Sequence, residues 1–444
     1  MSFVRVGLRL ALLLAVACVH APPVTRPGQP AASRPQVQPA VAPNNATIPS
    51  PTPWSRPSAP AATTYGGPPL PPFDDGPLTA QVRKAIRREV ASAGFAAPVS
   101  DGRLDRAAAD LARVPAGSIT NELVGFFVHH YGVAEPQPGL LVVHTDAGDA
   151  DAADLAMTQL RPRLTKVAWP RLGVGSYRAN GTVNIIVLMG LSAIDLQPLP
   201  RVLQGSASAS FAGSLPAGYG NAEFVLTTPS GATVHLPLQV QGRGFRGAFS
   251  CVAGPGAYDV ELLAEASRGP EVMVNVPVFC DVAPPARFDG SATDLFAGAT
   301  TPLAVENTML AVINDLRAKR HLPALILDVR LRDVARRHSD EMARLERVAH
   351  TSPDGRTPVD RIRAAKLSPT SLGENVGGAT SPAAVHDGFM ASPGHRSNVF
   401  DALATHAGIG VVATTSSDGA VVWYVTELFA RFSPLPPAAQ KRNR

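Results

Sequence analysis

Four short motifs in the last third of the chain constrain its fold more than any other feature. They are AHTSPDG at 349–355, GEN at 373–375, SPGHRSN at 392–398 and GIGV at 408–411. Between them, the first three distribute His350, Glu374 and His395 over three loops, and a strand pattern follows. Because loops carry chemistry when a rigid scaffold brings them together, we predict that these three side chains share one site.

The overall composition indicates several units joined by segments without a core. The 444 residues include 43 Pro and 38 Gly, and the length is typical of about three domains. The net charge is +5, but no dense Lys/Arg block with interleaved aromatic residues occurs. Nucleic-acid binding is therefore not predicted.

The N-terminus has the layout of an export signal. An apolar run over 8–17 follows a basic start, ends at Cys18 and is too short to span a bilayer. The sequence LAVAC resembles the bacterial lipobox, in which the Cys becomes the lipidated first residue of the mature protein. We predict that residues 1–18 are a signal peptide and that the protein is an exported lipoprotein of the cell envelope or outer membrane. The alternative is an ordinary signal peptide cut near Ala17 or Ala21, followed by secretion.

Proline-rich segments separate the predicted domains. Residues 19–76 are crowded with Pro, Ala and Thr, which predicts a disordered tether. Residues 285–301 form a second, shorter linker, and residues 433–444 are predicted to be a tail.

Residues 201–284 are typical of an antiparallel, Ig-like β-sandwich, since short alternating segments are separated by Pro, Gly and Ser turns. Cys251 and Cys280 would join two of its strands in an exported, oxidising compartment. Such a bridge would contribute about 3.5 kcal/mol on a chain-entropy estimate. The GxGxxG string at 242–247 is predicted to be a turn, because no helix pattern follows it.

The sequence of residues 77–200 predicts a mixed α/β domain, and two of its segments are similar to segments of the C-terminal third. The segment at 101–112 (DGRLDRAAADLA) is similar to 328–339 (DVRLRDVARRHS), and the segment at 173–187 (GVGSYRANGTVNIIV) is similar to 408–425 (GIGVVATTSSDGAVVWYV). We interpret this domain as a diverged copy of the C-terminal fold without its motifs. Coincidence between short Arg/Ala-rich strings is the alternative.

Residues 302–432 predict two helices, loops, a third helix and strands. Thr301 followed by Pro is a helix start, and a second helix from about 328 carries an apolar stripe at helical spacing. His338 belongs to that stripe, so a place at the edge of the core is predicted for it.

With its motifs in this order, the region 303–430 resembles the CAP superfamily, which comprises cysteine-rich secretory proteins, antigen 5 and plant pathogenesis-related type 1 proteins. It is most similar to the bacterial secreted branch. The resemblance implies an α-β-α sandwich whose central cleft is lined by two His and two acidic residues. The complete prediction is a multidomain α+β chain with the CAP-type fold at 302–432.

The family's site carries over residue by residue. The histidines fall on His350 and His395, the first acid on Glu374, and the position of the second acid holds Ser392. Glu427 is another possible source of a carboxylate. Two imidazoles and one carboxylate match an open three-ligand zinc site, so Zn²⁺ at His350 and His395 is one hypothesis.

A structural network is the other hypothesis for these residues. Buried His and Glu side chains need hydrogen-bond partners, and Asn375 and Asn398 would serve as amides that tie the loops together. Ser392 is predicted to cap the following helix rather than act as a nucleophile, since no GxSxG elbow occurs.

The resemblance implies binding rather than turnover as the commoner role. The predicted function is a secreted or surface-anchored CAP-domain protein whose cleft binds a lipid, glycan or protein without catalysis. One alternative is a metal-assisted hydrolase of peptide or cell-envelope polymer, with Glu374 as acid/base. The other is a purely structural interaction protein.

Overall fold

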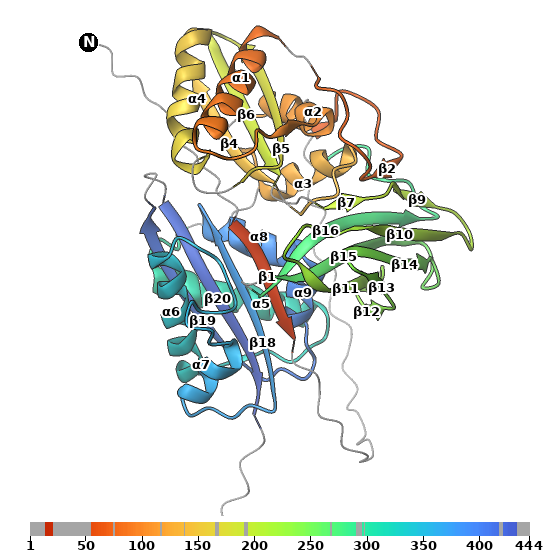
Figure 1. Ribbon diagram of the computed structural model, residues 1–444. Coiled ribbons are helices and arrows are strands. Elements are labelled where there is room, and N and C mark those ends of the chain that lie inside the picture. The colour runs from red at the N-terminus through yellow and green to blue at the C-terminus, as the bar shows by residue number, and fades with distance from the viewer. Residues whose placement is uncertain are drawn as a thin grey trace, which may run out of the picture.

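The computed structural model describes residues 14–20 and 55–432, apart from short gaps at 74–75, 116–117, 137, 165–167, 191–193, 267–268, 290–294, 297 and 417–420. Two α/β units lie one above the other in Figure 1, and a β-rich unit, which is central in the sequence, lies beside them at the right. We call them the first unit (77–190), the central unit (195–280) and the C-terminal unit (302–431). None of the described helices combines the length and apolarity needed to cross a membrane.

The first unit has helices on both faces of one sheet (Figure 1). The sheet has the order β3-β5-β6-β4, formed by Val99–Ser100, Arg171–Ala179, Thr182–Gly190 and Gly139–Thr145. One face packs on α1 (Pro77–Ser92) and α4 (Asp149–Leu164), and the other on α2 (Gly102–Ala112) and α3 (Asn121–His130).

The C-terminal unit repeats this plan. Its sheet has the order β1-β18-β20-β19-β17, with β1 (Leu14–His20) as an additional edge strand. The other four strands are Ser371–Ala379, Val421–Arg431, His406–Thr415 and Ile326–Leu327. One face packs on α5 (Pro302–Lys319), α8 (Pro382–Ala391) and α9 (Pro393–Val399). The other face packs on α6 (Val329–Arg344) and α7 (Pro358–Ala364).

Close helix–strand packing in both α/β units depends on paired glycines. A Cβ added at Gly173 would lie 2.3 Å from the backbone of Leu104 in α2, and one added at Gly408 would lie 2.3 Å from the backbone of Leu331 in α6. The glycines two residues further on approach the same helices as closely. These glycines belong to the GVG and GIG strings at the start of the two similar segments. The similarity of the strings therefore has one physical cause, which is the close approach of a helix to the strand.

The central unit consists of two sheets with a common apolar core. One has the order β13-β14-β10-β7, formed by Gln239–Gln241, Gly244–Ser250, Ser208–Ser214 and Asp195–Leu196. The other has the order β12-β11-β15-β16-β9, formed by Thr233–Leu236, Gly220–Thr227, Gly256–Ala266, Gly269–Cys280 and Val202–Leu203. The predicted turn at 242–247 is confirmed only at its start, where Gly242 has a φ of 59° between β13 and β14. It is wrong for 244–247, which lie in β14 and pair with β10.

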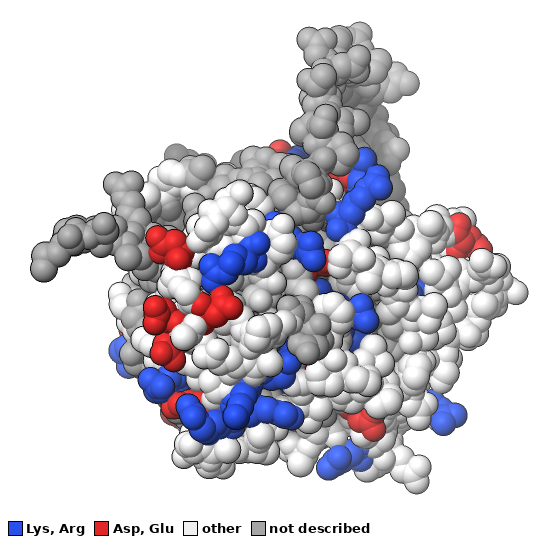
Figure 2. Space-filling model, turned by 90° about the horizontal axis from the view of Figure 1, so that it is seen from above, with Lys and Arg blue, Asp and Glu red and all other residues white. Residues whose placement is uncertain are grey.

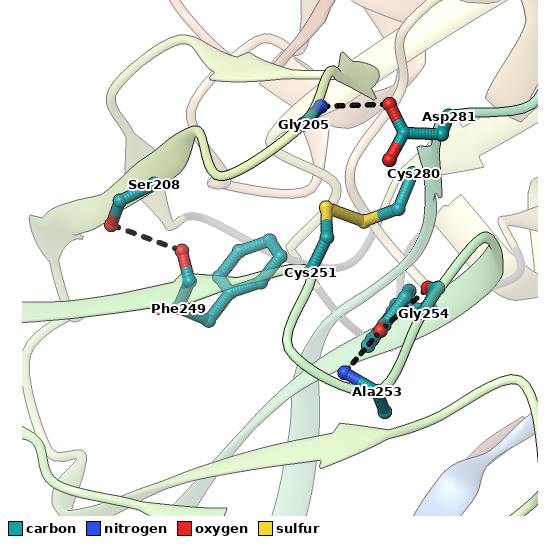
Figure 3. Close-up of a disulfide and its surroundings, with 9 residues drawn as sticks. Gly205, Ser208, Phe249, Cys251, Ala253, Gly254, Cys280 and Asp281 are labelled. Atoms are coloured by element: carbon teal, nitrogen blue, oxygen red, sulfur yellow. Dashed lines mark hydrogen bonds between the residues drawn. A yellow bond between two sulfur atoms is a disulfide. The ribbon is translucent and has the colours of Figure 1, made fainter.

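The predicted disulfide between Cys251 and Cys280 is present (Figure 3). Cys280 is buried at the end of β16. The carboxylate of the next residue, Asp281, accepts a 2.7 Å hydrogen bond from the amide of Gly205. The bridge therefore holds the end of β16 beside neighbouring loops of the central unit.

The predicted tether over 19–76 is wrong for residues 55–73. Tyr65 lies in β2 (Thr64–Tyr65), which pairs with β8 (Leu199–Pro200), and is fully buried. Its hydroxyl donates a 2.7 Å hydrogen bond to the carbonyl of Pro277. One aromatic anchor fixes a segment whose composition alone indicated disorder.

Of the other segments outside the predicted domains, the structure describes parts of the linker and of the N-terminal segment. In the linker at 285–301, Phe288 packs on the core of the first unit and Phe296 is buried in the core of the C-terminal unit. Leu14–His20 forms β1, antiparallel to β18, and includes position 18, the predicted lipidation site. The remainder of the predicted signal peptide, residues 21–54 and the tail at 433–444 lie outside the described residues.

Lys and Arg side chains are interspersed with Asp and Glu on the face that Figure 2 shows, and large parts of this face carry neither. This view looks down on the molecule of Figure 1 from above.

Candidate functional site

His350 and Glu374 meet in a buried ion network. The ring of His350 donates from Nδ1 to Oε1 of Glu374 over 2.7 Å, and each side chain is only 1 % exposed. Arg361 of α7 donates from Nη2 to the other oxygen of Glu374 over 2.7 Å, and from Nη1 to the carbonyl of His350 over 2.8 Å. Both oxygens of the Glu374 carboxylate are therefore engaged.

The charge of Glu374 is stabilised by these partners. Burial by itself would raise the pKa of Glu374, but the guanidinium of Arg361 and the hydrogen bond from His350 outweigh it and lower the pKa to about 2. Glu374 is therefore a carboxylate at neutral pH. A group with so low a pKa is a weak general base.

A second buried network lies next to the first and ties the loops together. Asn375 donates from Nδ2 to Glu427 over 2.9 Å and to the backbone carbonyl of His395 over 3.2 Å. Asn398 donates to the side chain of Asn375 over 2.9 Å and to the carbonyl of Glu374 over 3.2 Å. The two amides thus connect strand β18 with helix α9 and strand β20.

The remaining acid and imidazole candidates are also buried. Burial raises the pKa of Glu427 to about 8, with Asn375 as a hydrogen-bond donor. The ring of His395 is fully buried and stacks on Phe389, with ring centroids 5.3 Å apart. His338, predicted at the core edge, is buried in α6 and donates from Nε2 to the carbonyl of Ala349 over 2.8 Å.

Ser392 contacts the central unit instead of capping α9. It occupies the N-cap position of that helix, but its side chain makes no capping hydrogen bond. Its hydroxyl donates over 2.7 Å to Oε1 of Glu261 in β15, and the amide of Gly394 donates over 2.8 Å to Oε2. The prediction of a local cap is therefore wrong, because a buried carboxylate from a distant strand takes the hydroxyl hydrogen.

Glu261 is fully buried at this interface. Burial raises its pKa to about 7, although Ser392 and Gly394 donate to the carboxylate. Arg396 of α9 forms an ion pair with Asp259, which lies two residues before Glu261 on β15.

The first residue of β16 lies against His350. A Cβ added at Gly269, the first residue of β16, would lie 3.2 Å from Cβ of His350 and 3.7 Å from its ring atom Cδ2. Nε2 of His350, next to Cδ2 in the ring, is buried and has no hydrogen-bond partner among the residues that the structure describes. The central unit therefore lies against the ring of His350 at Gly269.

These residues do not fit the predicted zinc site. Within the described part of the chain, no three His, Cys, Asp or Glu side chains are arranged to hold a metal ion. Glu374 already binds a guanidinium, whose charge would repel a cation, and His350 uses Nδ1 for the same carboxylate.

A surface cavity of about 490 Å³ opens between α6 and α7, and Arg337, Arg344 and Arg356 are among its lining residues. Arg344 pairs with Asp340 at 3.1 Å and Arg356 with Asp354 at 2.6 Å. Two of these arginines are therefore paired with acids on the same surface.

The first unit lacks an equivalent site. When the two sheets are aligned on their paired glycines, aliphatic side chains occupy the polar positions of the C-terminal unit. Leu140, Leu141 and Val187 take the places of Glu374, Asn375 and Glu427 in the strand register. The adjacent His129 and His130 are structural. His129 packs edge-on against Tyr65, and His130 donates from Nε2 to the carbonyl of Ala59 over 2.9 Å.

Sequence reasoning identified part of the site and missed its interface. His350 and Glu374 share one network, and Asn375 and Asn398 form the adjoining one. His395 joins the second network through its backbone carbonyl, while its ring stacks on Phe389. Arg361 and Arg396 each pair with a carboxylate, Arg361 with Glu374 and Arg396 with Asp259.

Asp259, Glu261 and Gly269 were missed, since each lies in the central unit and only tertiary packing brings it to the loops. The one available signal was a pair of acids at alternate positions, Asp259 and Glu261, in an otherwise apolar strand segment.

The fold, the motif order and the buried His–Glu pair together define a CAP domain in the C-terminal unit. Residues 310–428 match the family described as "CAP: Cysteine-rich secretory protein family". The resemblance predicted from the motifs is therefore confirmed for this region.

Similar proteins come from several bacteria. "Uncharacterized protein YkwD" of Bacillus subtilis (strain 168) is 32% identical over 114 residues, which are 26% of this chain and 44% of that protein. The chain thus spans less than half the length of this curated relative.

Solved structures with similarity include an outer surface protein from Borrelia burgdorferi, which has 22% sequence identity. The match covers 29% of this chain and 93% of that chain, and the TM-score is 0.26. An extracellular protein containing a SCP domain from Bacillus anthracis str. Ames has 17% identity, 54% and 87% coverage, and a TM-score of 0.26.

Proposed function

We propose that this chain is an exported bacterial surface protein whose CAP domain works by binding and not by turnover. A lipid, glycan or protein is the proposed ligand class. The observation that carries this proposal is the Glu374 carboxylate, whose two oxygens are held by His350 and Arg361 in a buried network.

The chemistry of the alternatives supports the same choice. A hydrolase needs a base that can take a proton or a metal with an open position. Glu374 is ionised but saturated with donors, and the hydroxyl of Ser392 donates to Glu261 rather than to a histidine.

The remaining units have supporting roles in this proposal. The shared strand order, the paired glycines and the aliphatic residues at the polar positions support a first unit that is a second, CAP-like copy without a site. We assign an Ig-like sandwich to the central unit and a lipid anchor to Cys18.

The test measures turnover and binding on the full-length protein. Hydrolysis of dye-labelled casein and dye-labelled bacterial cell wall is assayed at neutral pH, with Zn²⁺ and with a chelator. Binding is measured with phosphatidylglycerol vesicles and with cell-wall glycan. Wild type is compared with Glu374→Gln and with Asp315→Asn, which changes an exposed acid on α5.

We expect no hydrolysis by any of the three proteins and binding to one of the two probes. Hydrolysis by wild type that disappears in Glu374→Gln but persists in Asp315→Asn would establish the enzyme alternative. Binding to neither probe, together with loss of stability in Glu374→Gln, would support the purely structural alternative.

A further inference from the structure

The cleft side of the CAP domain is in contact with another part of the same chain. Gly269 lies against the His350 ring, and Glu261 accepts hydrogen bonds from Ser392 and Gly394. Both central-unit residues belong to the β15–β16 hairpin. The hairpin therefore contacts two of the four motifs that define the site.

Polar contacts along the hairpin fix its position. Asp259, on the same strand face as Glu261, pairs with Arg396. Asn275 of β16 donates from Nδ2 to the carbonyl of Ala391, just before the Ser392 turn, over 2.8 Å. Charged and polar groups that match in position on both sides are typical of a specific interface.

Glu261 also accounts for a departure from the family pattern. The CAP resemblance implies a second acid at the position held by Ser392. The structure has a carboxylate next to that position, but it comes from β15 of the central unit, 131 residues earlier in the chain. Ser392 suits this arrangement, because a hydroxyl can donate to a carboxylate and a second carboxylate there could not.

We propose that the β15–β16 hairpin occupies the cleft of the CAP domain as a built-in ligand, with Glu261 as the carboxylate that this domain lacks at position 392. This inference rests on the proposed binding function and names the occupant of the same site. The cleft then recognises an extended, acidic polypeptide strand. An external ligand of that chemistry has to displace the hairpin before it binds.

The test measures access to His350 and needs no external ligand. Full-length protein is treated with diethylpyrocarbonate, which acylates accessible imidazole nitrogens, and each histidine is followed by peptide mass spectrometry. His235 has a side chain that is 63% exposed, so it reports the unhindered rate. His338 is buried within the CAP domain itself and reports unfolding of that domain.

Three variants separate hairpin displacement from other effects. Glu261→Ala removes the central carboxylate, and Asp259→Asn removes only the partly exposed ion pair with Arg396. Glu265→Ala is the matched control, since this exposed acid is on the same strand and its side chain accepts from Asn221 within the central unit.

In wild type and in Glu265→Ala we expect His350 to react at least tenfold more slowly than His235. Glu261→Ala should raise the His350 rate at least tenfold while His338 stays protected, and Asp259→Asn should raise it two- to threefold. If Glu261→Ala exposes both His350 and His338, the domain has unfolded and Asp259→Asn alone decides.

The proposal is overturned if His350 reacts in wild type as fast as His235, or if Asp259→Asn leaves its rate unchanged. Neither result depends on whether the protein turns over a substrate. Failure of this inference is therefore distinguishable from failure of the proposed function.

Discussion

At the scale of single residues, the Glu374–Arg361 pair shows how a buried charge is tolerated. Removing two charges from water costs several kcal/mol each, and only close, well-directed hydrogen bonds compensate that cost. Here the guanidinium bridges the carboxylate and the carbonyl of His350. The pair is thus strongly coupled, and the loss of one partner leaves the other buried and uncompensated.

Glu374→Gln should therefore lower the free energy of unfolding of the CAP domain by about 3–5 kcal/mol, because Arg361 keeps a buried charge. Hydrogen exchange of core amides in β18 and β20 measures this loss within the CAP domain. The double variant Arg361→Leu/Glu374→Leu should recover much of it. Asp340→Asn on the exposed face of α6 should change stability by less than about 1 kcal/mol. Equal effects of Glu374→Gln and Asp340→Asn would contradict this account.

The pKa of Glu427 is shifted in the direction opposite to that of Glu374. Its pKa is raised by burial to about 8 from the ordinary 4.5, so the folded state holds its proton over a range in which the unfolded state has lost it. Stability should fall as pH rises from about 4.5 through 8, by up to about 1.4 kcal/mol per pH unit. Glu427→Gln should flatten this dependence, as measured by urea unfolding at pH 5, 6.5 and 8. A slope that the substitution leaves unchanged would exclude Glu427 as its source.

Some residues of the site were predictable because they belong to short motifs with known partners. His350 and Glu374 were identified this way, and their hydrogen bond follows from the fold. Glu261 was not, since an acidic residue in a strand of alternating polarity normally faces solvent. Its burial depends on the docking of two units, which no local pattern encodes.

At the scale of elements, the two α/β units depend on the same close approach of helix and strand. Gly175 lies against α2 and Gly410 against α6, where an added Cβ would come within 2.2 Å and 2.1 Å of backbone nitrogen atoms. Such contacts cannot be relieved by rotating a side chain. The helix or the strand has to move instead.

Gly410→Ala and Gly175→Ala should each destabilise the unit that contains them by about 1–3 kcal/mol or more, as expected for an overpacked core. Gly125 lies in α3 with open space where its Cβ would be. Gly125→Ala should therefore be neutral or slightly stabilising. Hydrogen exchange resolved by peptide assigns each effect to its unit. An effect of Gly175→Ala that spreads into β19 and β20 would show that the two units do not unfold separately.

The sequence pattern predicted these elements well where periodicity was strong. Helix α6 begins after Asp328, whose side chain caps the first turn, as its apolar stripe indicated. Within the predicted sandwich, the alternating pattern breaks at Pro237, which cannot donate to a sheet ladder, and two short strands, β12 and β13, lie on either side of it. The anchoring role of Tyr65 was invisible, since its partners lie in units far along the chain.

At the scale of the whole molecule, the central unit connects the two α/β units. The backbone amide of Asn275 donates over 3.2 Å to the carbonyl of Ala134 in the first unit, and its side chain donates to Ala391 of the CAP domain. Both contacts come from strand β16. The position of this strand thus affects both neighbours at once.

The disulfide holds the far end of the same strand. Cys251→Ala/Cys280→Ala should lower the free energy of unfolding of the central unit by about 3.5 kcal/mol, because the bridge closes a loop with a sequence separation of 29 residues. Core amides of β15 and β16 should exchange faster, while those of β5 and β6 in the first unit should keep their protection. Wild type in a reducing agent serves as the matched control and should behave as the double variant does. If reduction leaves the exchange of β16 unchanged, packing alone holds this strand and the bridge contributes little to the interface at His350.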